Sequence, residues 1–217
     1  MIFARLIALL VGYLFGNFQT GYLYGKSKGI DIRKHGSGNA GTTNTLRTLG
    51  VKAGLITFLG DCFKAVFAIL IIKYIFRNQF TDSIKILEMY AGFGTVLGHN
   101  FPFYLGFKGG KGIACTAGVI LAVCPLATII CLIVFISIVA ITRYVSLGSI
   151  IMISVFLIQV VVFNHLGMLG IDSSRFSLEF EFDIIAACFT CMGIWRHKAN
   201  IIRLLSGNEN KFAMSKK

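Results

Sequence analysis

The stretch IACTAGVILAVCPLATIICLIVFISIVAIT, residues 113–142, decides how this chain folds. It is apolar throughout, and as one helix it would be about 45 Å long, whereas the hydrocarbon core of a bilayer is about 30 Å thick. Pro125 offers a break near its middle. We therefore predict a short span or half-span over 113–123 and a full span over 125–141.

The charges of the flanking segments support this break, because cytoplasmic loops of membrane proteins are enriched in Lys and Arg. If residues 113–142 crossed the membrane once, the basic C-terminal tail would end outside and the preceding acidic loop would end inside. If the chain turns back near Pro125, both obey the rule. The tail carries Arg196, His197, Lys198, Arg203, Lys211, Lys216 and Lys217, and the acidic loop carries Asp172, Glu179, Glu181 and Asp183.

The other apolar runs predict the remaining spans. The run over 1–24 is too long and continuous for a signal peptide, so we expect it to be retained as the first span. Further spans are predicted at 54–76, 84–105, 146–163 and 182–194. The basic loop 26–52 follows the first span, which places the N-terminus outside and the C-terminus in the cytoplasm. We predict an all-α integral membrane protein, a single bundle of about seven transmembrane helices with short or half-spanning elements, forming one membrane-embedded domain over residues 1–217.

The composition agrees with this class. The chain is 56% hydrophobic and its mean hydropathy is +0.78, which argues against a soluble domain. The net charge is +12. The basic residues that produce it lie between apolar runs, where the topology of a membrane protein would place them, so nucleic-acid binding is not indicated. The six cysteines fall within or beside apolar segments and imply no disulfide framework, and the lone CxxC at 188–191 supports neither a zinc site nor a redox pair.

The segment GHNFPFYLGFKGGKG, residues 98–112, has the character of an anion site. Its glycines allow backbone N–H groups to approach a ligand, and a helix beginning after Gly112 would direct its positive dipole end toward the same point. Lys108 and Lys111 add positive charge. The alternative is a flexible basic turn between two spans.

The loop HGSGNAGTTNTLRTLG, residues 35–50, gathers short polar side chains around Arg47, which can form two hydrogen bonds to one phosphate. The alternative is a polar loop that caps a helix. Gly36, Gly38 and Gly41 nominally match the dinucleotide fingerprint, but we reject it because the fingerprint must follow a strand within a βαβ unit.

Two further segments carry candidate polar residues. In RYVSLGSI, residues 143–150, Ser146 and Ser149 share a helical face, although Arg143 alone is typical of a topology anchor. In RHKANIIRLLSGNEN, residues 196–210, His197 and Asn200 share a face, the alternative being a basic helix on anionic lipid.

Few of the nine acidic residues fall near these cytoplasmic loops on the predicted topology, which argues against a carboxylate dyad or an acidic metal site. Asp61 and Lys64 within the second span are spaced as neighbours on one helical face, and we expect a structural charge pair. No metal is indicated.

Taken together and in this order, these four segments resemble the motifs of the acyl-phosphate:glycerol-3-phosphate acyltransferase family, PlsY, over nearly the whole chain. The resemblance implies transfer of a fatty acyl group from acyl-phosphate to the sn-1 hydroxyl of glycerol-3-phosphate, giving lysophosphatidate and phosphate without a cofactor. It also implies a multi-pass protein of the bacterial cytoplasmic (inner) membrane, in contact with membrane lipids and functionally coupled to the enzyme that makes acyl-phosphate.

The resemblance implies a catalytic set of Ser37, Arg47, Lys111, His197 and Asn200. The wider substrate-binding set that we expect comprises Gly38, Asn39, Thr43, His99, Lys108, Gly109, Gly110, Gly112, Arg143, Ser146 and Ser149. Whether Ser146 or Ser149 lines the site is left open.

Two other classes of function would explain part of the pattern. A transporter of phosphate or an organophosphate would also need a basic polar cavity, but no inverted repeat is evident and the candidate residues cluster on one side. A structural protein that only binds anionic lipid would explain the charge but not the glycine spacing.

Overall fold

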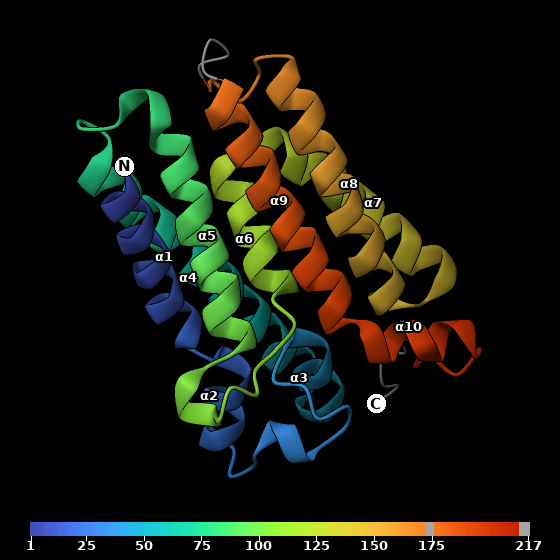
Figure 1. Cartoon of the computed structure of the whole chain (residues 1–217). Helices are drawn as coiled ribbons and strands as arrows, with labels where there is room; N and C mark the ends of the chain where they lie inside the picture. Colours follow the sequence, from blue (N-terminus) through green and yellow to red (C-terminus); the bar gives the residue numbers. More distant parts are fainter. Residues whose placement is uncertain (172–175, 213–217) are drawn as a thin grey trace. The chain divides into compact units, whose positions relative to one another are not determined.

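The computed structural model describes residues 1–171 and 176–212, and these residues form helices and connecting turns without any strand (Figure 1). The chain divides into two compact units, Met1–Val123 and Cys124–Lys217. The helices of the first unit are α1 (Ile2–Asn17), α2 (Thr20–Ser27), α3 (Thr42–Leu49), α4 (Val51–Phe76), α5 (Ile84–Asn100) and α6 (Ile113–Val123). Short 3₁₀ turns lie at η1 (Ile32–Lys34), η2 (Thr81–Ser83) and η3 (Phe103–Leu105).

Helices α1 and α5 pack along glycine faces. Gly12 and Gly16 on α1 lie against the backbone of α5, and Gly94 and Gly98 on α5 lie against the backbone of α1. A Cβ atom on Gly16 would lie 2.8 Å from the Cα atom of Gly98. Small residues spaced by four allow two helix backbones to come this close, which is typical of helix pairs within membranes. This contact places the C-terminal end of α5, and the loop that follows it, beside the end of α1.

The N-terminal apolar run, predicted as the first span, is long and apolar enough over Ile2–Ser27 to cross a membrane, but it consists of two helices. It breaks between α1 and α2 at Phe18 and Gln19. The Gln19 side chain is fully buried and donates Nε2–H to the carbonyl oxygens of Gly16 at 3.1 Å and His99 at 3.0 Å. The Phe18 carbonyl accepts a hydrogen bond from Lys64 Nζ at 2.5 Å. These side chains satisfy the backbone groups that the break would leave unpaired in an apolar environment.

The short helix α6 is held at its C-terminal end by Lys85, which belongs to an ion cluster around the Glu88 carboxylate. Lys85 Nζ donates to the Val123 carbonyl at 2.9 Å. The carboxylate of Glu88, which is completely buried, lies 3.3 Å from both Lys85 Nζ and Lys73 Nζ. A short apolar helix in a membrane is stable only where protein or water satisfies its terminal carbonyls, and Lys85 does so here.

The second unit contains α7 (Pro125–Thr142), α8 (Val145–His165), α9 (Phe176–Arg196) and α10 (Lys198–Leu205). The predicted break at Pro125 is confirmed, since α6 ends at Val123 and Pro125 occupies the first turn of α7. Proline is favoured there because the first N–H groups of a helix have no partner within it. Helix α7 ends where Arg143 adopts a left-handed conformation with φ of 62°.

Helix α9 begins earlier than the predicted span at 182–194, so part of the acidic segment that we assigned to a loop is helical. Glu179 lies in its first turn, where a carboxylate interacts favourably with the helix dipole. Asn164 on α8 donates Nδ2–H to the Glu179 carbonyl and to the Asp183 carboxylate, both at 3.0 Å. These contacts tie the start of α9 to the end of α8.

Within the described residues, four helical segments are long and apolar enough to cross a membrane, namely Ile2–Ser27, Val51–Phe76, Pro125–Thr142 and Val145–His165, and Ile113–Val123 is a shorter apolar helix. The count of about seven spans and the orientation of the termini stay predictions. Asp172, Lys216 and Lys217, which entered the charge argument, lie outside the described residues.

Candidate active site

The first polar loop is organised by Asn44 at the start of α3. Its Oδ1 atom accepts from the Ser37 N–H at 2.7 Å, and its Nδ2 atom donates to the carbonyls of Ile32, His35 and Asn39 at 2.9–3.1 Å. Asn44 is buried, with 2% of its surface exposed. The short polar side chains of this loop were expected to bind a ligand, whereas Asn44 fixes the loop backbone.

The loop presents Ser37 and Arg47 at the surface. Ser37, Gly38 and Arg47 are exposed, and Arg47 lies in the last turn of α3. Thr43 is half-buried in the first turn of α3, and the Asn39 Oδ1 atom accepts from the Gly41 N–H at 2.9 Å. The side chain of Asn44 therefore holds the backbone of Ser37, while the side chain of Asn39 shapes the turn before α3.

The glycine-rich segment before α6 lies directly on His99 and Asn100 at the end of α5. The Gly110 N–H donates to the His99 carbonyl at 3.1 Å, and the Gly109 N–H donates to the Asn100 carbonyl at 3.2 Å. A Cβ atom on Gly110 would clash with the imidazole ring of His99, lying 2.9 Å from Cδ2 and from Cε1 and closer still to Nε2. Only glycine fits against the ring, and Gly112 has φ of 81°, a conformation that also favours glycine. Lys111, between them, is half-buried.

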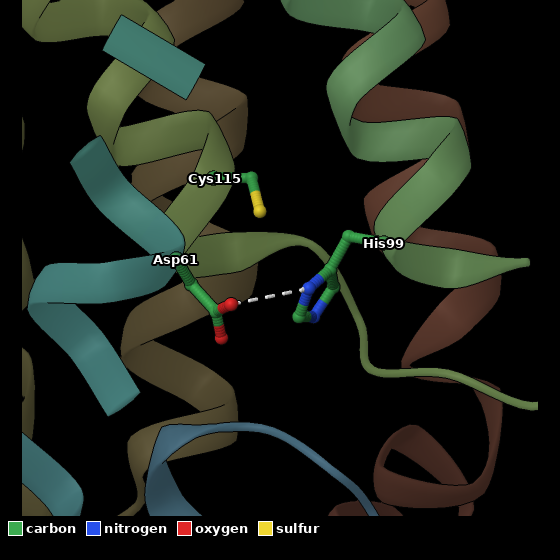
Figure 2. A group of neighbouring side chains, drawn as sticks. All are labelled: Asp61, His99 and Cys115. Atoms are coloured by element: carbon green, nitrogen blue, oxygen red, sulfur yellow. Dashed lines mark ion pairs between the residues drawn. The ribbon is translucent and has the colours of Figure 1, made fainter. Parts of the chain in front are cut away.

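His99 belongs to a buried polar cluster within the first unit (Figure 2). Lys64 Nζ on α4 lies 2.8 Å from Asp61 Oδ1 and 2.9 Å from His99 Nδ1. Thr20 Oγ1 on α2 donates to the same Asp61 oxygen at 3.1 Å. The predicted Asp61–Lys64 pair is therefore present, and it extends to His99. Its burial places His99 inside the protein beneath the glycine segment rather than at an exposed surface.

Asp61, His99 and Cys115 come close enough for one metal ion, their ligand atoms lying within 4.8 Å of one another (Figure 2). The Lys64 ammonium already lies within hydrogen-bond distance of both Asp61 and His99. A cation at this place would face a buried positive charge, so the donor set suits an internal ion pair better than a metal.

The two polar loops of the first unit are linked by Arg33. Its guanidinium pairs with the Asp31 carboxylate at 2.8 Å, stacks over the Tyr22 ring at 4.8 Å and reaches the Leu105 carbonyl at 3.5 Å. The hydrogen bond from Arg33 lowers the pKa of Asp31 to about 2. The loop that carries Ser37 is therefore connected to the segment that carries Lys108, which is itself exposed.

In the second unit, Glu209 collects three side-chain donors. Its Oε1 atom accepts from Asn200 Nδ2 at 2.8 Å and from Ser146 Oγ at 3.0 Å, and its Oε2 atom accepts from Arg203 Nε at 2.8 Å. Burial opposes ionisation, but the hydrogen bonds from Asn200, Arg203 and Ser146 outweigh it and lower the pKa of Glu209. Glu209 thereby joins Asn200 on α10 to Ser146 on α8.

The remaining predicted residues of this unit occupy different environments. His197 is buried just before α10 and its Nδ1 atom lies 2.7 Å from the Gly193 carbonyl oxygen. Ser149 is also buried and donates Oγ–H to the Val145 carbonyl of its own helix at 2.8 Å. Arg143 is exposed, and its carbonyl accepts from the Phe212 N–H at 2.6 Å. Of the two serines, Ser146 is the one that contacts the Asn200 cluster.

Comparison with known proteins decides the family. Residues 6–207 match the family model described as "Glycerol-3-phosphate acyltransferase". A protein of that name from Clostridioides difficile (strain 630) is 45% identical over 219 residues, covering 99% of this chain and 98% of the relative. A second, from Alkaliphilus metalliredigens (strain QYMF), is 40% identical and covers 95% of each chain. This chain belongs to the glycerol-3-phosphate acyltransferase family.

The acyltransferase fold is confirmed by solved structures. The chain is similar to the crystal structure of PlsY (YgiH), an integral membrane glycerol 3-phosphate acyltransferase, in its glycerol 3-phosphate form, with a TM-score of 0.81, 33% identity and 96% of both chains covered. It is similar to the lysophosphatidic acid form with a TM-score of 0.79 and 34% identity, covering 97% of this chain and 96% of that one. The protein is therefore an all-α integral membrane glycerol-3-phosphate acyltransferase that crosses the membrane more than once.

Sequence reasoning missed residues that organise this acyltransferase. Glu209 lies within the segment 196–210 but was not predicted as a site residue, because its role depends on a hydrogen bond from Ser146, which is distant in sequence. Its position after a helix-ending Ser-Gly-Asn run, among basic residues, was the available signal. Lys64 was expected to pair with Asp61 alone, and its contact to His99 on α5 was not foreseen.

Proposed function

We propose that this enzyme takes its acyl group from a fatty acyl-phosphate and transfers it to the sn-1 hydroxyl of glycerol-3-phosphate, giving lysophosphatidate and inorganic phosphate. The observation that carries the proposal is the similarity over 96% of the chain to a structure named for its glycerol 3-phosphate form, together with the match to one named for its lysophosphatidic acid form. Those names describe a substrate and a product of one acyl transfer.

The reaction balances without a cofactor. The hydroxyl oxygen of glycerol-3-phosphate attacks the carbonyl carbon of the acyl-phosphate and forms the ester bond. The bond between that carbon and the phosphate oxygen breaks, and its electron pair leaves with phosphate. The hydroxyl proton goes to the departing phosphate or to a protein base. Since acyl-phosphate is already activated, orientation and charge neutralisation supply most of the catalysis.

In the first unit, we propose roles for three groups, and the site geometry supports them. The N–H groups of Gly109 and Gly110 are already bonded to the end of α5, so we propose that the start of α6, directly after Gly112, directs its positive dipole end toward a phosphate. Lys111 adds a cation there. Arg47 is exposed at the end of α3, where its guanidinium can hold a phosphate through two hydrogen bonds. Ser37, whose N–H is held by the Asn44 side chain, is proposed to supply a hydroxyl donor from the loop that precedes α3.

In the second unit, His197 is the candidate protein base. A carbonyl oxygen only accepts hydrogen bonds, so the 2.7 Å contact with Gly193 places the proton of a neutral His197 ring on Nδ1. Its Nε2 atom then carries the lone pair that can accept a proton. Asn200, oriented by Glu209, is proposed to bind substrate by hydrogen bonds. We favour the departing phosphate as the main proton acceptor, with His197 as the weaker candidate.

The enzyme is proposed to work on the cytoplasmic face of the bacterial inner membrane, where its basic loops lie under the predicted topology. Its partners are then glycerol-3-phosphate, fatty acyl-phosphate and membrane lipid, and it depends on the enzyme that makes acyl-phosphate.

A comparison of acyl donors tests the proposal. Purified protein in lipid nanodiscs is given glycerol-3-phosphate with palmitoyl-phosphate or palmitoyl-CoA, and the product is analysed by mass spectrometry and for acyl position. We expect 1-acyl lysophosphatidate from palmitoyl-phosphate only. Product from palmitoyl-CoA at an equal rate, or acylation at the other hydroxyl, would contradict it.

The role of the base is tested with His197→Ala. If phosphate accepts the proton, single-turnover acyl transfer slows by no more than about tenfold at saturating substrate, below the usual contribution of a general base. A loss of about a thousandfold with unchanged glycerol-3-phosphate binding would assign the proton to His197 instead.

A further inference from the structure

The buried cluster of Thr20, Asp61, Lys64 and His99 contains more contacts than the Asp61–Lys64 charge pair alone. The side chains of Asp61 and Lys64 are 1% and 4% exposed. Their charges neutralise each other, yet Lys64 also donates to the Phe18 carbonyl at the α1–α2 break and contacts His99 on α5. One lysine therefore connects three parts of the first unit, which are the α1–α2 break, α4 and the end of α5.

The contact with Lys64 fixes the orientation of the His99 ring. An ammonium group only donates hydrogen bonds, so His99 Nδ1 accepts and the ring proton of His99 lies on Nε2. The opposite edge of the ring, which carries Nε2, faces Gly110 closely enough to exclude any Cβ atom there. Rotation of the ring would therefore displace Gly110.

The backbone on both sides of this contact leads directly to Lys111. The N–H groups of Gly109 and Gly110 donate to the carbonyls of Asn100 and His99, so the segment rests on the end of α5 through hydrogen bonds as well as through the ring. A displacement of Gly110 moves Lys111, its immediate neighbour. Catalysis that depends on orientation is sensitive to such a shift, and a misplacement of about 1 Å can reduce a rate about 100-fold.

We propose that Asp61 and Lys64 are positioning residues for acyl transfer, which act through the His99 ring to hold the Gly109–Gly110–Lys111 backbone in its reactive arrangement. They do not touch substrate in this account. Their effect on turnover rests on the proposed function, because it requires Lys111 to act on the acyl-phosphate. Their effect on the backbone does not.

The test separates this positioning from simple neutralisation of charge. Lys64→Met alone leaves Asp61 buried without its partner, so the deciding variant is the double change Asp61→Asn with Lys64→Met, which removes both charges at similar volume. The control is Lys73→Met, which also removes a lysine of α4 that pairs with a buried carboxylate, Glu88. Nine residues along the helix separate the two lysines by about 13 Å.

Two quantities are measured for each variant in nanodiscs, namely kcat with palmitoyl-phosphate and glycerol-3-phosphate, and hydrogen–deuterium exchange of peptides covering 106–112. For the double variant we expect kcat to fall between about tenfold and 100-fold. We also expect amide exchange in this segment to rise at least about tenfold, while the melting temperature stays close to that of wild type. Lys73→Met should change neither kcat nor this exchange.

Wild-type kcat and exchange in the double variant would overturn the proposal and leave Asp61 and Lys64 as a charge pair only. Loss of folding in the double variant would also overturn it, because the cluster would then support the whole unit rather than this segment. If wild-type protein itself failed to turn over palmitoyl-phosphate, the proposed function would fail, whereas the exchange comparison would still decide the positioning.

Discussion

Replacing Gly110 by alanine tests the packing of the glycine segment on His99. The added methyl carbon would lie 2.9 Å from two ring carbons of His99 and closer still to Nε2, whereas ordinary contacts begin at 3.4 Å. The ring and the segment cannot both keep their positions. The ring is held by Lys64 at 2.9 Å on its other edge, so we expect the segment to move.

The overlap requires a displacement of about 1 Å, which corresponds to a loss of about 100-fold in kcat/KM, or about 2.7 kcal/mol of transition-state stabilisation. Gly106→Ala is the matched control. It lies in the preceding turn with φ of 63° and no atom within 4 Å of the new Cβ. Its cost is limited to about 1–2 kcal/mol of stability from the left-handed conformation.

The assay is kcat/KM for glycerol-3-phosphate at saturating palmitoyl-phosphate, with the melting temperature of each variant measured in the same nanodiscs. We expect Gly110→Ala to lose about 100-fold and Gly106→Ala to remain within about threefold of wild type. Equal losses in both variants, or full activity in Gly110→Ala, would refute the argument that contact with His99 sets the position of Lys111.

Glu209→Gln should lower the free energy of unfolding by about 1.5–3 kcal/mol, because the charge-assisted hydrogen bonds from Asn200, Ser146 and Arg203 are weakened. Since the folded pKa of Glu209 lies below its ordinary value of 4.5, its contribution is complete above that pH and is lost as the pH falls through the folded pKa. Melting temperatures of wild type and Glu209→Gln should therefore converge in acid, and a constant difference down to pH about 3 would contradict this. Lys85→Met should destabilise the protein by about 1–3 kcal/mol, because the Val123 carbonyl loses its donor and buried Glu88 loses one of two cations. Lys85→Arg should retain most of the stability, and unchanged unfolding of Lys85→Met would show that the end of α6 is held in another way.

The helices were predictable where an apolar run is bounded by a residue that ends or begins a helix, such as proline. Pro125 marks the start of α7, and the apolar runs over 54–76 and 146–163 correspond closely to α4 and α8. Proline cannot continue a helix through its missing N–H, so its effect is local and visible in sequence. The predicted third span at 84–105 ends early, at Asn100, because Pro102 follows.

The break between α1 and α2 was not predictable in the same way. Hydropathy continues through Phe18, and the groups that satisfy the interrupted backbone come from elsewhere, since Lys64 lies on α4 and Gln19 donates to α5. Tertiary hydrogen bonds of this kind leave no periodic signal in the sequence.

The candidate site was predictable as a set of segments but not as a set of contacts. Glycine spacing predicted that backbone N–H groups at 109–112 approach a ligand, whereas in the structure Gly110 packs against His99 and its N–H is bonded to α5. The sequence could not show that Asn44 faces inward or that Glu209 joins Ser146 to Asn200. Such roles depend on which side of an element a polar residue occupies after packing, and short polar residues serve equally well as caps, as internal links and as ligands.

The most direct test of the central claim is release of phosphate from palmitoyl-phosphate by the purified protein, measured with and without glycerol-3-phosphate and beside Lys111→Ala. The account predicts release that requires glycerol-3-phosphate, matches lysophosphatidate formed one for one, and falls to background in Lys111→Ala. Phosphate release at the same rate without glycerol-3-phosphate would contradict it. So would the absence of turnover together with transport of labelled glycerol-3-phosphate into proteoliposomes.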